Sequence, residues 1–140
     1  MSATRPAGDG ETIMALFLAS HWENGWAVME IRGVLDTTTA EELRDFVAAV
    51  TAKHKHLLNL IADLSELTYT DAEALSPLVT AHTMLERDGG ELRLICPEGR
   101  VERILEASGL ARVLPVFPSL DAALAAGRPT GGDRKRRPAQ

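Results

Sequence analysis

The chain has 140 residues, of which 45% are hydrophobic and 25% charged, so one compact domain is expected and a two-domain enzyme is excluded. Residues 128–140 carry five basic side chains and one acidic one, which leaves 10 basic against 19 acidic side chains in residues 1–127. Such an acidic body repels a phosphate backbone, so we expect no nucleic-acid binding by the folded part.

The two ends of the chain differ in composition from its middle. Residues 1–12 are small, polar and rich in Gly and Pro, and residues 128–140 repeat this character with added basic charge. We expect a disordered N-terminal segment over 1–12, a folded domain over 13–127 and a basic flexible tail over 128–140. The basic run 134–137 is more typical of a solubilising tail than of a lipid or RNA contact.

The folded part opens with the pattern of a β-hairpin. Two apolar runs, 13–19 and 26–31, are separated by a polar stretch that contains Asn24 and Gly25, the strongest short hairpin signal. Trp26 begins the second run and is expected on a sheet face, with a polar N–H that needs a partner.

A helix and a buried strand follow the hairpin. Thr38 and Glu41 have the spacing of a capping box, and the strand is expected over 57–64, which is apolar except for Asn59 and Asp63. The helix is predicted by the apolar stripe of Ala40, Leu43, Phe46, Val47 and Val50.

The remaining chain alternates between helices and strands. A helical stripe that includes His82 ends at Gly89 and Gly90, and later signals predict strands over 92–96 and 113–117. Gly109 ends a further helix, and Ser119 caps a terminal one over 120–126. The order ββαβαβαβα predicts an α/β fold: a mixed, mostly parallel sheet of about five strands with helices packed against it. The two central helical stripes are Leu75, Leu78, Val79, His82 and Leu85, and Val101, Ile104, Leu105 and Ser108.

The motifs of common enzyme classes do not occur. There is no G-x-S-x-G nucleophile elbow and no Gly-rich phosphate loop, so we expect a non-enzymatic protein without a metal or cofactor. His54 and His56 are more typical of a solvated turn than of a metal site. His82 is expected to be half-buried and satisfied by one carbonyl.

The sequence also shows no pattern typical of a targeting signal. The longest apolar run is seven residues and follows acidic residues, so no signal peptide or membrane span fits. Cys96 is the single cysteine and cannot form an internal disulfide; we expect a small, buried apolar residue with a reduced thiol. These observations predict a cytoplasmic protein.

The segment 58–78 (LNLIADLSELTYTDAEALSPL) carries the most informative pattern, a buried strand followed by a loop and a helix start. Together with motifs on either side, it resembles the STAS-domain, anti-sigma factor antagonist family over about residues 13–126. The matching motifs are Gly33, Leu35 and Asp36; Asp63, Leu64 and Ser65; Asp71 and Leu75; and Ile104, Leu105, Ser108, Gly109 and Leu110.

The chain departs from this family at one motif. The resemblance implies an Asp-Ser-Ser-Gly sequence whose first Ser is phosphorylated by a partner that is both anti-sigma factor and kinase. Here Asp71 is kept, but Ala72, Glu73 and Ala74 follow. Ala72 therefore occupies the phosphoacceptor position and cannot be phosphorylated. Thr68, Thr70 and Ser76 are weaker candidates for a displaced acceptor.

A second departure is Pro77, which lacks an N–H. Either Asp71 caps the helix and Pro77 lies inside it, leaving the Glu73 carbonyl without a donor, or Ser76 is the cap and Pro77 the first helical residue.

The resemblance implies a non-enzymatic regulator that binds an anti-sigma factor, a kinase-like ATPase protein, and so releases a sigma factor. Binding to the partner is expected to be constitutive. The chain itself could form a homodimer, and the sequence does not decide this. Two alternatives remain: a scaffold subunit of a stress-signalling or lipid-transport complex, and a small-ligand or nucleotide sensor. The resemblance places the contact surface at Asp36, Thr37, Asp71, Ala72, Glu73, Ala74 and Ser76.

Overall fold

The computed structural model describes residues 15–53 and 58–127. The predictions for 1–12, for 128–140 and for His54 and His56 lie outside these residues. The described chain forms one six-stranded sheet in the order β1-β2-β3-β5-β6, with β4 paired to β2. The elements are β1 (Leu16–Glu23), β2 (Trp26–Leu35), α1 (Ala40–Ala52), β3 (Asn59–Asp63), β4 (Leu67–Thr70), the 3-10 turn η1 (Glu73–Leu75), α2 (Ser76–Arg87), β5 (Glu91–Ile95), α3 (Arg100–Ser108), α4 (Leu110–Val113), β6 (Val116–Phe117) and α5 (Leu120–Ala125).

The hairpin and the mostly parallel sheet are as predicted. Asn24 and Gly25 both have positive φ angles, and β1 pairs antiparallel with β2 up to Glu23 and Trp26. β1 therefore runs further than the predicted 13–19, since the polar residues before the turn are also paired. All other strand pairs are parallel.

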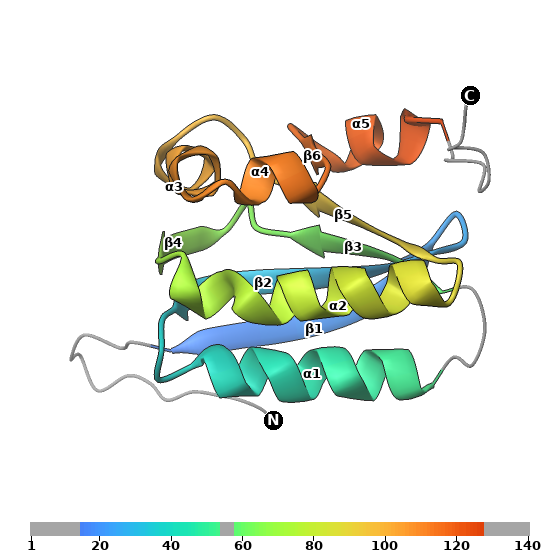
Figure 1. Ribbon diagram of the computed structural model, residues 1–140, viewed down its shortest axis with the longest axis horizontal. Coiled ribbons are helices and arrows are strands. Elements are labelled where there is room, and N and C mark those ends of the chain that lie inside the picture. The colour runs from blue at the N-terminus through green and yellow to red at the C-terminus, as the bar shows by residue number, and fades with distance from the viewer. Residues whose placement is uncertain (1–14, 54–57, 128–140) are drawn as a thin grey trace.

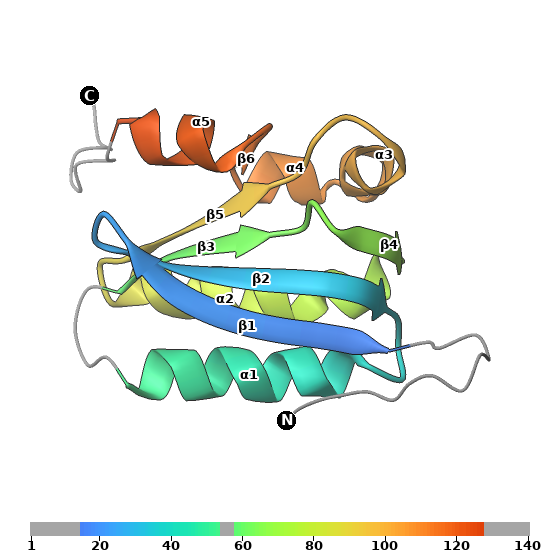
Figure 2. The same cartoon turned by 180° about the vertical axis from the view of Figure 1, so that it is seen from behind.

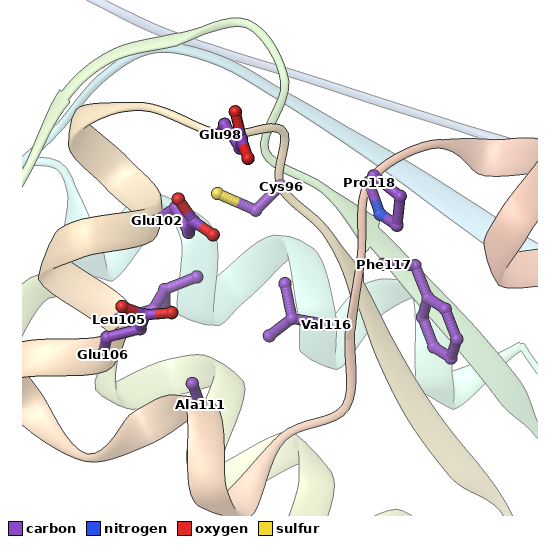
Figure 3. A pocket seen from close by; sticks show the side chains of 9 residues that line it. All are labelled: Cys96, Glu98, Glu102, Leu105, Glu106, Ala111, Val116, Phe117 and Pro118. Atoms are coloured by element: carbon purple, nitrogen blue, oxygen red, sulfur yellow. The ribbon is translucent and has the colours of Figure 1, made fainter.

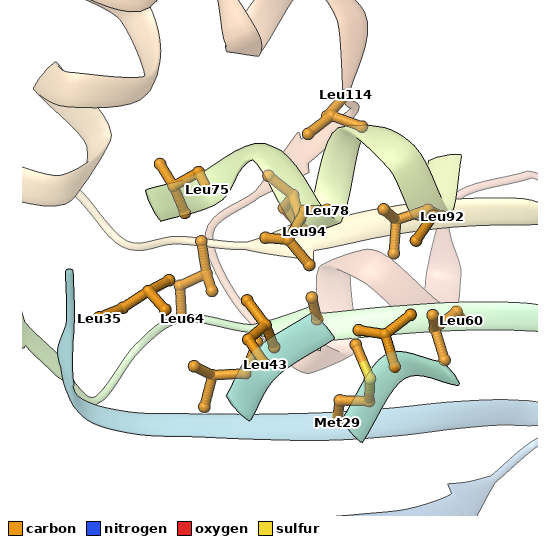
Figure 4. Close-up of a cluster of buried hydrophobic side chains, with 14 of the residues drawn as sticks. Met29, Leu35, Leu43, Leu60, Leu64, Leu75, Leu78, Leu92, Leu94 and Leu114 are labelled. Atoms are coloured by element: carbon orange, nitrogen blue, oxygen red, sulfur yellow. The ribbon is translucent and has the colours of Figure 1, made fainter. Parts of the chain in front are cut away.

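Helices α1 and α2 cover one face of the sheet, in front of it in Figure 1 and behind it in Figure 2. The core between them is aliphatic, because alternate residues of β2, β3 and β5 point toward the helices. Figure 4 shows its largest side chains, among them Met29, Leu35, Leu43, Leu60, Leu64, Leu75, Leu78, Leu92, Leu94 and Leu114.

Helix α5 packs on the opposite face, at one end of the sheet. Its Ala123 and Leu124 contact Trp26, Val28 and Ile61 in a second, smaller core. Ser119 caps the helix as predicted, accepting a hydrogen bond from the N–H of Ala122 at 3.1 Å.

A buried arginine holds the C-terminal end of α5 in place. Arg93 on β5 is 2% exposed, and its guanidinium lies 4.5 Å from the centre of the Trp26 ring. It donates hydrogen bonds to the carbonyls of Ala123, Ala126 (3.2 Å) and Gly127 (2.7 Å), which the helix end leaves without donors. The strand was predicted over 92–96, but the burial of a charged residue within it was not.

The C-terminal strand differs from its prediction over 113–117. Gly109, at φ +87°, ends α3 as expected, but a second short helix, α4, follows and includes Val113. The N–H of Leu114 donates to the carbonyl of Leu110, so the backbone groups of this segment are hydrogen-bonded within the helical turn. Only Val116 and Phe117 pair with β5.

Strand β4 lies in a segment that was predicted to be a loop. β3 pairs with the first half of β2 and ends at Asp63, after which the chain turns and β4 pairs with the second half of β2, at Leu35 and Thr70. A four-residue strand is too short to give a periodic signal, so its partner strand, distant in sequence, decides its conformation.

Candidate functional site

Three aspartates lie where strands end at the carboxyl edge of the sheet. In each, Oδ1 accepts a hydrogen bond from a backbone N–H two or three residues later: Asp36 from Thr38 (2.9 Å), Asp63 from Ser65 (2.9 Å) and Asp71 from Ala74 (2.8 Å). Side chains in this geometry fix turns and helix starts. The shared role of these carboxylates is therefore to shape the loops that follow the strands.

The sheet brings the Asp36 and Asp71 loops side by side. Leu35 and Thr70 are paired residues of the parallel strands β2 and β4, and each aspartate directly follows one of them. The predicted contact residues, split between two segments of the sequence, therefore occupy one edge of the sheet.

The Asp36 loop is closed by hydroxyl groups as well as by the backbone. Thr38 Oγ1 donates to Asp36 Oδ1 at 2.6 Å, and this bond, followed by the N–H groups of Thr39 and Thr38, lowers the pKa of Asp36 against the opposing effect of desolvation. Buried Thr39 accepts from the N–H of Asp36 (3.0 Å) and donates to the carbonyl of Val34 (2.9 Å). Sequence analysis did not single out Thr39.

The predicted capping box of Thr38 and Glu41 is wrong. Asp36 Oδ1 accepts from the N–H groups of Thr38 and Thr39, and helix α1 begins at Ala40 with no side-chain cap from Thr39. The ionised carboxylate is the stronger acceptor for these groups, so it takes the place of the Thr38 hydroxyl.

The Asp71 loop resolves the position of Pro77 in a way that differs from both alternatives. Asp71 Oδ1 accepts from the N–H of Ala74 within the 3-10 turn η1, whose N-cap is Ala72, and α2 begins separately at Ser76 with Pro77 as its second residue. The Glu73 carbonyl accepts from the N–H of Ser76, so it does have a donor. Pro77 lies in the first helical turn, where an N–H would have no helical partner.

The exposed members of the predicted surface are Thr37, Ala72, Glu73 and Ser76. Asp36 and Asp71 are partly buried, and Ala74 is 0% exposed, so its side chain belongs to the core and contributes no contact area. Sequence analysis also passed over Tyr69, which is 45% exposed and lies two residues before Asp71. The sequence signal that could have identified Tyr69 was an aromatic residue within a segment predicted to be a loop.

Two of the three displaced-acceptor candidates already use their hydroxyl groups. Thr70 is 2% exposed and its hydroxyl lies 3.4 Å from the carbonyl of Asp71, while the Thr68 hydroxyl donates to the carbonyl of Gly33 at 3.0 Å. Ser76 is exposed at the start of α2.

Cys96 lines a cavity of about 320 Å³ between β5 and α3, with Glu98, Glu102 and Glu106 around it (Figure 3). Burial, and then the charge of Glu102, raise the pKa of Cys96 to about 11. The thiol is thus protonated at neutral pH and a poor nucleophile or metal ligand, as expected of a buried apolar cysteine. Within residues 15–53 and 58–127, no cluster of three or more His, Cys, Asp or Glu side chains could hold a metal ion.

His82 is partly buried on α2, but its predicted carbonyl partner is wrong. Nε2 lies 3.6 Å from Glu86 Oε1, one turn along the helix, and the buried Nδ1 has no hydrogen-bond partner in the described part of the chain. The next helical turn offers a carboxylate at the spacing where side chains meet, so the ring faces that group.

Comparison with known proteins identifies the fold. Residues 21–123 match the STAS domain family. The chain is 38% identical over 68 residues to Rv2638 of Mycobacterium tuberculosis, which is named as a candidate anti-anti-sigma factor; this match spans 49% of the chain and less than half, 46%, of that relative. It is 28% identical over 99 residues to the anti-sigma-F factor antagonist RsfA of M. tuberculosis, covering 71% of the chain and 77% of RsfA.

Solved structures show the same fold. An anti-sigma factor antagonist from Mycobacterium paratuberculosis superposes with a TM-score of 0.72 at 24% identity, covering 81% of this chain and 94% of that one. The antagonist SpoIIAA in its unphosphorylated form gives 0.62 at 19% identity, covering 79% and 93%. Among the described residues, no helix has the length and apolar character needed to span a membrane.

Proposed function

Since this chain belongs to the STAS domain family, we propose that it acts as an anti-sigma factor antagonist, a non-enzymatic protein that binds an anti-sigma factor and thereby releases a sigma factor. Relatives named as anti-sigma factor antagonists support this role. The observation that carries it is the pairing of Leu35 with Thr70, which joins the Asp36 and Asp71 loops into one surface.

This surface is suited to contact with a protein. Both loops are held by hydrogen bonds that backbone N–H groups donate to their aspartates, so little conformational entropy is lost when a partner binds. Thr37, Ala72, Glu73 and Ser76 present small or acidic side chains to solvent. Glu73 adds a negative charge that steers association toward a basic patch on the partner.

Control by phosphorylation at the family position is not part of the proposal. Solved structures of SpoIIAA exist in unphosphorylated and phosphorylated forms, but Ala72 has no hydroxyl group to accept a phosphoryl group. Glu73 is a poor substitute for a phosphoserine, because it carries about half the charge and projects from the next position of the turn. Binding is therefore constitutive, and regulation falls to the abundance of the protein or to the partner.

The test uses purified anti-sigma factors of the source organism, titrated one by one against the full chain by calorimetry. One of them should bind and release its sigma factor in a transcription assay. Glu73→Lys should slow association and reduce its salt dependence, whereas Asp88→Lys, a matched charge reversal at the other end of α2, should not. Failure of every anti-sigma factor to bind would reject the role.

Phosphorylation is tested on the same complex. The protein and an Ala72→Ser variant are incubated with the binding anti-sigma factor and ATP, and the sites are mapped by mass spectrometry. Phosphate on the variant alone indicates a kinase-competent partner and a chain without an acceptor. Phosphate on the unmodified protein, at Ser76 for example, would contradict constitutive binding.

A further inference from the structure

A β-bulge interrupts the pairing of β4 with β2. Gly33 pairs with Leu67, but the next residue of β2, Val34, pairs with Tyr69, so Thr68 is the extra residue on β4. A shift of one residue in register reverses which face of the sheet each later side chain occupies. The bulge therefore decides where Tyr69 and Thr70 point.

The bulge reverses the apolar pattern of β4. Without it, Tyr69 would pair with Leu35, whose side chain is in the core, and Thr70 would lie outside. With it, Thr70 pairs with Leu35 and is 2% exposed, while Tyr69 pairs with Val34 on the opposite face and is 45% exposed. Burying a hydroxyl and exposing an aromatic ring opposes the hydrophobic driving force, and such local conflicts concentrate at functional sites.

Several contacts fix this arrangement. Gly33 has φ +97°, and a methyl group at this position would overlap the carbonyl oxygen of Ala15. Its N–H donates to the carbonyl of Glu66 at 3.1 Å, and its own carbonyl accepts from the Thr68 hydroxyl at 3.0 Å. The backbone pairing of β4 with β2 thus sets the face of the sheet on which Tyr69 lies.

Tyr69 lies next to the proposed contact surface and away from α5. Figures 1 and 2 place α5 over one end of the sheet and β4 at the other. The exposed acids Glu66 and Glu73 lie within four residues of Tyr69 along the chain. Tyr69 lines neither the cavity beside Cys96 nor a second hollow of about 560 Å³ beside α3. Its ring is 45% exposed to solvent and is therefore accessible to a partner.

We propose that Tyr69 is the aromatic anchor of the partner-binding surface: its ring enters an apolar cleft on the protein partner, and basic residues around that cleft face Glu66 and Glu73. Exposed tyrosines held rigidly within a contact surface contribute a large share of binding free energy. The class of the partner rests on the proposed function, whereas the position of the anchor rests on the bulge.

The first test measures affinity for the anti-sigma factor that binds the full chain. Tyr69→Ala should weaken binding about 30-fold, and Tyr69→Phe should retain most of it, because the ring fills the cleft. Trp22→Ala is the matched control, since Trp22 is also a highly exposed aromatic residue but lies near the hairpin turn of β1. Circular dichroism and unfolding curves verify that each variant is folded. Binding of a folded Tyr69→Ala variant within twofold of the unmodified protein would overturn the proposal and leave the proposed function intact.

The second test does not depend on the class of partner. A photo-crosslinking phenylalanine analogue is placed at position 69, or at position 22 as control, in the full chain expressed in its source organism, and adducts are identified by mass spectrometry. A defined protein crosslinked from position 69 but not from 22 supports the anchor. If that protein is not an anti-sigma factor, the proposed function fails while the anchor stands. No adduct from position 69, or the same adducts from both positions, would overturn the anchor.

Discussion

One face of the sheet lies opposite helices α1 and α2, and the two ends of that face differ in what covers them. At one end, α5 covers Trp26, Val28 and Ile61, and the buried guanidinium of Arg93 binds the last carbonyls of that helix. At the other end, β4 leaves an aromatic ring exposed and buries Thr70 in its place. The first arrangement stabilises the fold, whereas the second leaves the Tyr69 ring accessible to the partner proposed above.

The largest effect is expected at the covered end. Arg93→Met should lower the free energy of unfolding by about 3 kcal/mol, because it leaves the buried carbonyl of Ala123, the carbonyls just after α5 and the neighbouring Glu91 carboxylate without their partner. Urea unfolding measures the loss. Arg32→Met is the control: Arg32 is an exposed residue paired with Glu30, so its loss should cost less than about 0.5 kcal/mol. Equal effects of the two variants would contradict a stabilising role of the buried Arg93.

The bulge is the next most sensitive feature. Gly33→Ala should destabilise the protein by about 2 kcal/mol, from its left-handed backbone and from the overlap with Ala15. Gly25→Ala separates the two causes, since Gly25 has φ +85° but open space around it, and should cost about 1 kcal/mol. If Gly25→Ala proved as costly in thermal unfolding, the close approach of β1 to Gly33 would have no energetic role.

A smaller effect is expected at Thr68. Thr68→Val keeps the shape of the side chain but removes the hydroxyl donor to Gly33, and should lower stability by about 1 kcal/mol. Thr83→Val is a matched control, because the Thr83 hydroxyl bonds only to a carbonyl of its own helix, that of Val79. Equal stability of the two variants by urea unfolding would show that the Thr68 bond does not hold the bulge.

The smallest effect concerns pH and the loop beside the exposed ring. Folding lowers the pKa of Asp36, so this carboxylate stabilises the fold fully above its unfolded pKa of about 3.9, and that contribution is lost as the pH falls through the lower, folded value. Asp36→Asn should therefore unfold with a shallower pH dependence below about pH 4. Asp45→Asn, at an exposed position of α1, serves as control. Identical acid-unfolding profiles for the unmodified protein and Asp36→Asn would contradict the shift.

Local signals in the sequence determined much of the fold and part of the candidate site. Asn24 and Gly25 fix the hairpin, Gly109 and Ser119 delimit helices, and the apolar stripes define α1 and α2. These features depend on neighbours within four residues, so they are legible without the tertiary structure. The contact surface predicted around Asp71 came from the family resemblance of a local motif and stays a prediction.

Only the tertiary structure decided the features that depend on distant partners. Thr68 and Gly33 are 35 residues apart, and Arg93 binds carbonyls 30 to 34 residues away. The sequence LTYT has the same alternation of apolar and polar residues whether or not a bulge is present. Arg93 is of a residue type that is normally exposed, and it is buried here because α5 covers it. Strand register and burial are set by pairing across the sheet, so the exposed face of Tyr69 follows from β2 and not from β4 itself.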